Sequence, residues 1–82
     1  IMIKIKIKCF SQVRYALGKD EIALELDEGT TSDDLEKMIR EKALGKLENV
    51  TLGIAINKKY VLDDTKLNDG DEIAFIPPVQ GG

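Results

Sequence analysis

The sequence contains no histidine and only one cysteine, and these two facts exclude several classes of chemistry. Without histidine, the chain cannot supply an imidazole for Ser–His–Asp or Cys–His catalysis, for a zinc site or for a proton relay. A single cysteine excludes a disulfide framework, a cysteine-based zinc site and a four-cysteine iron–sulfur cluster. Cys9 continues the apolar phase of a strand, which is typical of a buried, unreactive thiol. We therefore expect no metal site and no bound cofactor.

Long apolar runs and an excess of positive charge are also missing. No apolar segment approaches the roughly 20 residues that a membrane-spanning helix needs. The net charge is −3, which argues against general nucleic-acid binding. The chain has 82 residues, enough for one domain with a two-layer core. We expect a cytoplasmic protein that binds neither nucleic acid nor a membrane.

Apolar and polar residues alternate in several short segments, which is the period of a half-buried β-strand. The first is the clearest, because Ile3, Ile5 and Ile7 alternate with lysines. The same pattern predicts further strands over residues 22–26, 52–56, 60–62 and 72–76, and the prolines at 77 and 78 end the last one.

One main helix is predicted over residues 32–44. Thr31 suits the N-cap, and Asp34 three residues later completes a variant of the capping box. The apolar residues of this segment recur at helical spacing and form one face: Leu35, Met38, Ile39 and Ala43. A shorter helical segment is expected after the first strand, with Ser11 as its cap and Gly18 as its end.

This order of elements predicts an α+β fold in which one helix packs across one face of a mixed sheet. If the first and last strands are central parallel neighbours, the fold is a β-grasp, or ubiquitin-like, domain over residues 1–77. The alternation predicts a largely buried set of side chains, which comprises Ile3, Ile5, Ile7, Ile22, Leu24, Leu35, Ile39, Ile54, Ile56 and Phe75.

The segment after the last strand is the strongest candidate for a functional site, because neither a strand nor a helix pattern accounts for its sequence. Pro77 and Pro78 favour a stiff, extended lead, and Gly81 and Gly82 follow. Without Cβ atoms, a diglycine is thin enough to enter a narrow channel and flexible enough to turn inside it. We therefore expect residues 78–82 to form an exposed tail that presents the carboxylate of Gly82 to another protein.

The block from Asp69 to Gly82 closely resembles the C-terminus of the MoaD family, the sulfur-carrier subunits of molybdopterin synthase. It contains an Asp-Gly-Asp-Glu turn, an apolar strand, Pro-Pro-Val and the terminal diglycine. Residues 10–14 and 54–57 are also similar to that family's segments, so that the resemblance spans the chain. One departure is Ile76, where the family often has an aromatic residue.

The resemblance implies a β-grasp protein that is not an enzyme on its own and works through its tail. An E1-like (MoeB-like) partner would use ATP to adenylate Gly82, and sulfur would then convert the adenylate into a thiocarboxylate. Inserted into the large (MoaE-like) catalytic subunit, in a heterotetramer, the thiocarboxylate would donate sulfur to precursor Z, cyclic pyranopterin monophosphate. Two transfers would build the molybdopterin dithiolene.

An apolar surface beside the tail is the expected docking site for these partners, since apolar residues that lead into an exposed segment favour protein contacts. Its predicted members are Phe10, Phe75, Ile76, Pro77, Pro78 and Val79.

Other readings of the diglycine stay open at this point. The ThiS-type carrier of thiazole synthesis also ends in Gly-Gly, although it generally lacks the Pro-Pro pair. Carriers of the ubiquitin-related-modifier type serve tRNA thiolation, and some archaeal relatives also conjugate to lysines as protein modifiers. A plain β-grasp interaction module would have no use for the diglycine.

Overall fold

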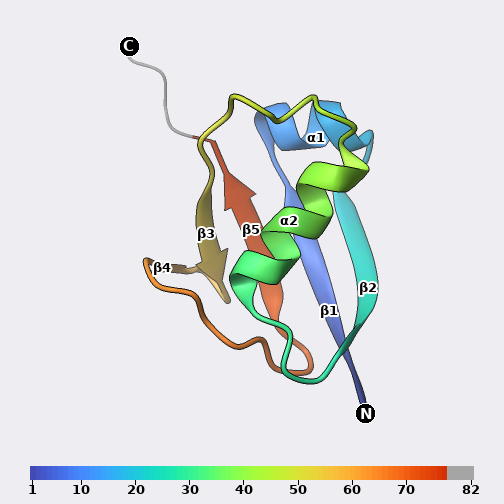
Figure 1. Cartoon of the computed structure of the whole chain (residues 1–82), viewed down its shortest axis with the longest axis vertical. Helices are drawn as coiled ribbons and strands as arrows, with labels where there is room; N and C mark the ends of the chain where they lie inside the picture. The colour runs from blue at the N-terminus through green and yellow to red at the C-terminus, as the bar shows by residue number, and fades with distance from the viewer. Residues whose placement is uncertain (78–82) are drawn as a thin grey trace.

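The computed structural model describes residues 1–77, which contain five strands and two helices. In chain order these elements are β1 (Met2–Cys9), α1 (Ser11–Leu17), β2 (Glu21–Asp27), α2 (Ser32–Lys42), β3 (Gly53–Ile56), β4 (Lys59–Val61) and β5 (Glu72–Ile76). The strands form one sheet in the order β2-β1-β5-β3-β4 (Figure 1). β1 and β5 are parallel, and all other neighbours are antiparallel. The prediction that the first and last strands pair as inner parallel neighbours is confirmed.

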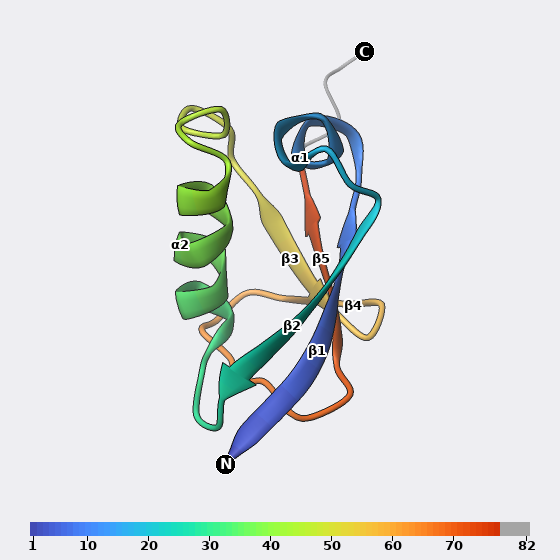
Figure 2. The ribbon, with the colours of Figure 1, turned by 90° about the vertical axis from the view of Figure 1, so that its right-hand side faces the viewer.

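The molecule has two layers, as the sequence predicts. α2 crosses one face of the sheet, whereas α1 lies at one end of it, next to the end of β1 (Figure 2). Within residues 1–77 no helix covers the opposite face, which we call the open face (Figure 2). No helix in this part of the chain is long and apolar enough to cross a membrane.

Alternate side chains of the sheet pack against α2 to form the core. Ile7, Leu35, Ile39 and Phe75 are completely buried. Of the predicted core residues, all are buried except Ile22, Leu24 and Ile56, which are half-buried but packed against the core. β2 is an edge strand and Ile56 ends β3 at a hairpin, so these three side chains have neighbours on fewer sides.

Two buried leucines come from connections that carry no alternation. Leu47 and Leu67 are each 1% exposed and belong to the core cluster. Sequence analysis missed both, because a residue in an irregular segment has no periodic neighbours to reveal which way it points.

The predicted capping of α2 is confirmed. The Asp34 N–H donates to Oγ1 of Thr31, and the Thr31 N–H donates to Asp34 Oδ2 at 3.1 Å. The helix ends at Lys42, two residues before the predicted boundary, because Leu44 and Gly45 adopt φ angles of 52° and 85°.

The prediction that Ser11 caps α1 is wrong. Ser11 is the first residue of that helix, and Phe10 occupies the N-cap without a capping side-chain hydrogen bond. The predicted end is confirmed, since Gly18 is left-handed with φ 73° and its N–H donates to the carbonyl of Arg14.

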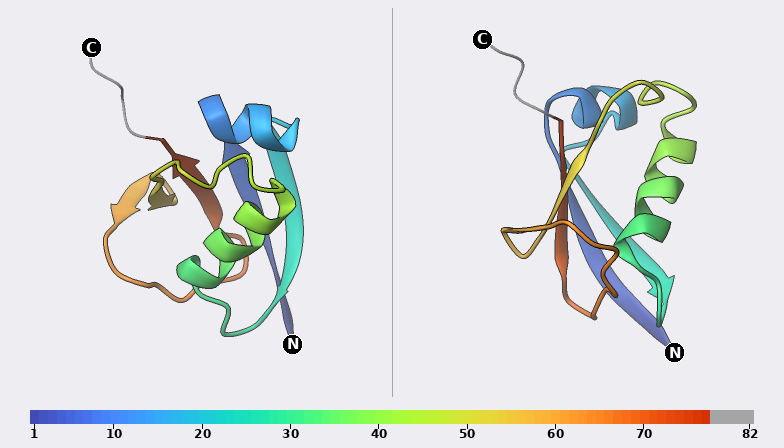
Figure 3. Two further views of the ribbon diagram at one scale, coloured as in Figure 1. Left: turned by 45° about the horizontal axis from the view of Figure 1, so that its top comes forward. Right: turned by 60° about the vertical axis from the view of Figure 1, so that its left-hand side comes forward.

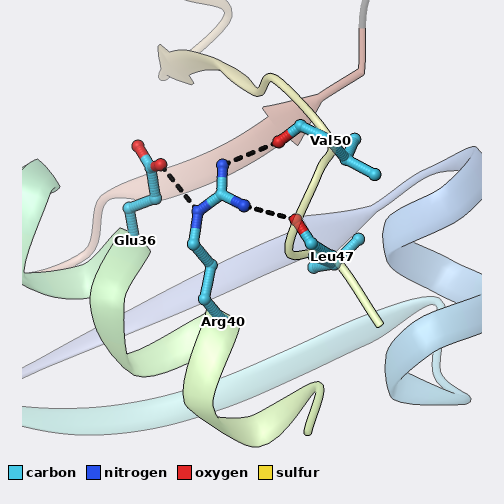
Figure 4. A network of polar contacts seen from close by, with 4 residues as sticks. All are labelled: Glu36, Arg40, Leu47 and Val50. Atoms are coloured by element: carbon cyan, nitrogen blue, oxygen red, sulfur yellow. Dashed lines mark hydrogen bonds and ion pairs between the residues drawn. The ribbon is translucent and has the colours of Figure 1, made fainter. Parts of the chain in front are cut away.

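Arg40 fixes the connection between α2 and β3 (Figure 4). Its Nε donates to Glu36 at 2.9 Å, and its two terminal nitrogens donate to the carbonyls of Leu47 and Val50. These bonds satisfy backbone acceptors that an irregular segment would otherwise leave to water. The connection therefore has a defined path to the start of β3.

Candidate functional site

The chain leaves the sheet from its middle strand. β5 lies between β1 and β3, and its last residue, Ile76, pairs with Gly53 of β3. Pro77 follows, and the predicted tail residues Pro78, Val79, Gly81 and Gly82 lie outside the described residues. The C-terminal segment therefore starts at the centre of one end of the sheet, with structure on both sides.

The side chains of β5 alternate between the core and the open face. Ile73 and Phe75 point toward α2 and are completely buried, whereas Ala74 and Ile76 lie on the open face and are half-buried. The prediction that Phe75 belongs to an exposed partner surface is therefore wrong, because its strand phase places it in the core. Pro77 is also buried, so it does not add to an exposed surface either.

Phe10 and Ile76 meet at the same end of the sheet because β1 and β5 are parallel. Lys8 is opposite Ala74 in the register, so the next open-face positions on the two chains are Phe10 and Ile76. Phe10 is 49% exposed, a high value for a large apolar side chain. The structure thus brings together two of the residues that the sequence predicts at the docking surface.

A groove with a volume of about 500 Å³ runs along this part of the open face, and we call it the open-face groove. Small side chains form its floor, since Ala55 of β3 lies opposite Ala74 of β5. Its lining residues are Lys8, Phe10, Ala55, Lys58, Tyr60, Glu72, Ala74 and Ile76.

Tyr60 is a member of this groove that sequence analysis missed. It is 67% exposed and comes from β4, at the far edge of the sheet from β2. Its ring lies beside Gly53 of β3, since a Cβ at Gly53 would be in ordinary van der Waals contact with Cε1 of Tyr60, at 3.4 Å. An aromatic residue in a short, polar segment was the available signal, but the sequence alone does not say which strand β4 pairs with.

Charges along the open face are largely paired across strands. Nζ of Lys8 lies 3.0 Å from Glu21, directly opposite it in the register, and Nζ of Lys4 lies 4.0 Å from Glu25. The hydrogen bond from Lys8 raises its pKa and lowers the pKa of Glu21. Two lysines of the β1 stripe are thus paired with acidic residues of β2, whereas Lys6 lies opposite Ala23 of β2 and Glu72 of β5.

The described residues form neither a reactive thiol nor a metal site. Cys9 is 4% exposed, and burial raises the pKa of its thiol, which is the opposite of what a reactive thiol needs. Within residues 1–77 no three His, Cys, Asp or Glu side chains come together in a way that could hold a metal ion.

Comparison with known proteins decides the family. The model of the ThiS family matches residues 7–82, which is nearly the whole chain and includes the terminal diglycine. The chain belongs to the ThiS family. The ThiS-family match, a β-grasp sheet and a diglycine that follows the middle strand agree with one another.

Two relatives show how close the similarity to known proteins is. The chain is 40% identical to a molybdopterin synthase sulfur carrier subunit of Dictyostelium discoideum, with 96% of each chain covered. It is also 40% identical to the protein of that name from Escherichia coli, with 95% of this chain and 99% of the relative covered. The resemblance to molybdopterin synthase sulfur carriers is confirmed.

Solved structures of similar proteins have the same fold. A Pyrococcus furiosus protein named as a molybdopterin converting factor subunit 1 is 33% identical with a TM-score of 0.83, covering 94% of this chain and 99% of that one. The small archaeal modifier protein 1 of Methanosarcina acetivorans is 28% identical with a TM-score of 0.77, covering 100% and 99%. The ubiquitin-like β-grasp fold of this ThiS-family chain is therefore confirmed.

Proposed function

We propose that this chain is the sulfur carrier subunit of a molybdopterin synthase, and that the carboxyl group of Gly82 carries the sulfur. One observation carries the proposal: the match to the ThiS family extends through a diglycine that is separated by four residues from the end of β5, the middle strand of the sheet. A tail that starts at the middle of the sheet end can enter a partner while the surrounding surface docks against it.

The proposed chemistry takes place on the tail in two stages. An adenylating E1-like enzyme uses ATP to convert the Gly82 carboxylate into an acyl-adenylate, which is a much better electrophile. A sulfur donor then displaces AMP and leaves a thiocarboxylate. The large subunit of the synthase accepts the tail and uses this sulfur to build the dithiolene on precursor Z.

The chain is proposed to carry the reactant while its partners supply the catalytic groups. It contains no histidine, so an imidazole acid or base must come from another protein. Its single thiol is buried in the core and cannot reach the tail's substrate. The role of Gly81 and Gly82 is to be narrow and flexible enough for two different active sites.

The open-face groove is the proposed docking surface for the large subunit. Phe10, Tyr60 and Ile76 surround small alanines beside the start of the tail, and an apolar side chain of the partner would fill this space. Contacts here fix how deep the tail can reach, because Ile76 both lines the groove and precedes the tail. The complete synthase would be a heterotetramer with two carriers.

A protein-modifier role is a second candidate, favoured by the similarity to the archaeal modifier protein. In that case the activated Gly82 would form an amide with a lysine of a target protein. Both functions need adenylation, and they differ in whether sulfur or a lysine amine displaces AMP.

Mass spectrometry of the protein from its native host separates the two candidates. A sulfur carrier gains the mass difference between sulfur and oxygen at its C-terminus, whereas a modifier yields branched peptides on lysines. In a synthase assay with the large subunit and the pterin precursor, the thiocarboxylated chain should form product. A chain with one residue added after Gly82 should be inactive, because displacements near 1 Å can cost about a hundredfold in rate. Product formation by the extended, unprocessed chain would contradict the mechanism.

A further inference from the structure

The β3–β4 hairpin turns through only two residues, Asn57 and Lys58. Ile56 pairs with Lys59, so these two residues form the whole loop. Both have positive φ angles, 51° for Asn57 and 71° for Lys58, which is the backbone of a type I′ turn. The hairpin projects on the side of the sheet away from α2 (Figures 2 and 3). Two of its residues, Lys58 and Tyr60, line the open-face groove and form one wall of it.

The fold accounts for Asn57 at the first of these positions. Its Nδ2 donates to Asp71 at 2.9 Å, and its Oδ1 accepts the N–H of Glu72 at 3.0 Å. Its backbone N–H also donates to the carbonyl of Glu72 at 2.8 Å. Asparagine tolerates the left-handed conformation, so Asn57 gains these bonds at little conformational cost.

The fold does not account for Lys58 at the second position. Glycine is the residue that a type I′ turn favours there, because a Cβ is disfavoured at positive φ. The side chain of Lys58 is exposed, and it makes no hydrogen bond or ion pair with any residue of the 1–77 region. A strained position without compensation within the domain points to a role outside it.

Lys58 is also the cation of the open-face groove that has no acidic partner among the residues described. The other cation, Lys8, is paired with Glu21 at 3.0 Å. Glu72 lines the groove too, and its cross-strand neighbour on this face is Lys6. Lys58 therefore offers a positive charge at the wall of an apolar groove that Tyr60 also lines.

We propose that Lys58 is a specificity-determining residue of the open-face groove, and that its ammonium group pairs with a carboxylate of the large subunit. The matching partner surface carries an apolar side chain that fits between Phe10 and Tyr60, and an aspartate or glutamate that reaches Lys58. The pair would select for the correct orientation of the partner and speed its association, as interfacial charge pairs do. This inference rests on the proposed function, since it takes the large subunit as the occupant of the groove.

The test measures the affinity of the full-length chain for the purified large subunit, at low and at physiological salt. Lys58→Gly removes the charge and the strained side chain together, Lys58→Glu reverses the charge, and Lys58→Arg keeps it. Lys59→Glu is the matched control, because it makes the same charge change one residue away, opposite Ile56, which lies on the α2 side of the sheet. Thermal unfolding of each variant reports on the fold.

We expect Lys58→Gly to bind about tenfold more weakly and Lys58→Glu about a hundredfold more weakly, with Lys58→Arg and Lys59→Glu close to the unmodified chain. The affinity of Lys58→Gly should also depend less on salt. Its unfolding midpoint should rise by about 3–6 °C, because the strain is relieved. A midpoint below that of the unmodified chain would show that the fold needs Lys58, and would overturn the inference.

Two further outcomes distinguish this inference from the proposed function. If the unmodified chain binds the large subunit and Lys58→Glu binds equally well, the role of Lys58 is wrong and the proposed function stands. If the unmodified chain does not bind the large subunit at all, the proposed function fails and the inference fails with it.

Discussion

Asn57 and Asp71 join the β3–β4 hairpin to the start of β5 through a hydrogen bond of 2.9 Å from Nδ2 to Oδ1. The second carboxylate oxygen of Asp71 accepts the N–H of Asn68 at 2.8 Å. Asp71 is 8% exposed, so both acceptor oxygens are largely shielded from solvent. The bond connects the wall of the open-face groove to β5, the last strand of the sheet.

Replacing Asp71 with alanine should lower the free energy of unfolding by about 1–3 kcal/mol. The change leaves the amide of Asn57 and the N–H of Asn68 without their acceptors in a half-buried site. Denaturant unfolding measures the loss. Asp63→Ala is the control, because Asp63 is exposed and only its backbone carbonyl takes part in a hydrogen bond, so the change should stay within about 0.5 kcal/mol. Equal effects of the two changes would contradict the role of Asp71.

Truncation of the core should have a larger effect. Leu35 is completely buried on α2 and Ile5 is 3% exposed on β1, so changing either to alanine should cost about 2–5 kcal/mol. Leu62→Ala is the control, because Leu62 is 99% exposed. A shift in the unfolding midpoint for Leu62→Ala as large as that for Leu35→Ala would show that the core is wrongly assigned.

Changes in the open-face groove should weaken partner binding while the domain stays folded. Ile76→Glu places a charge in the apolar groove, and Tyr60→Ala removes one wall, so both should lower affinity for the large subunit by about tenfold or more. Tyr15→Ala is the matched control, since Tyr15 is another exposed tyrosine, on α1, and does not line this groove. Titration of each variant with the large subunit gives the comparison. Wild-type affinity for Ile76→Glu would remove the groove from the docking surface.

The contribution of Asp64 to stability should depend on pH in the acid range. The N–H of Asp33 donates to Asp64 at 3.0 Å, and this bond, together with those from the side chains of Thr31 and Ser32, holds the pKa of Asp64 below its ordinary value of 3.8. Because the folded-state pKa is lowered, the stabilisation is complete above the ordinary value and is lost as the pH falls through the folded value.

The matching experiment compares the unfolding free energies of Asp64→Asn and the unmodified chain across this range. The difference should be constant at neutral pH and should shrink progressively below the ordinary value of 3.8. Asp63→Asn is the matched control, because Asp63 is exposed and its side chain makes no hydrogen bond with the described residues. A gap for Asp64→Asn that stays the same down to low pH would show that the carboxylate does not support the start of α2.

Much of the fold could be predicted because local patterns and tertiary packing agree. The isoleucines of β1 alternate, and the structure buries Ile3, Ile5 and Ile7 in that phase. Thr31 and Asp34 form the capping box that their spacing predicts. Ser11 shows where the approach fails, because the backbone turns sharply after β1 and places Phe10 at the N-cap. A cap residue is chosen by the path of the chain as well as by its type.

The candidate site was only partly predictable for a related reason. Phe10 and Ile76 were predicted as members of one surface, and the parallel pairing of β1 and β5 brings them together. Phe75 was assigned to the same surface although its strand phase buries it, and Tyr60 was missed because nothing in the sequence states that β4 pairs with β3. Residues far apart in the chain become one groove only through strand order.

The sequence by itself determined the strand segments, the main helix and the family, because alternation, capping and an unbroken C-terminal block are local properties of the chain. Only the tertiary structure decided which apolar residues near the tail are core and which are surface. Burial depends on the neighbours that strand order and helix placement supply. These neighbours can be far apart in the chain, such as Ile7 and Ile73, which pair across β1 and β5 although they are 66 positions apart. The positive φ angle of Lys58 is also decided only by the tertiary structure, because it follows from the two-residue turn that joins β3 to β4.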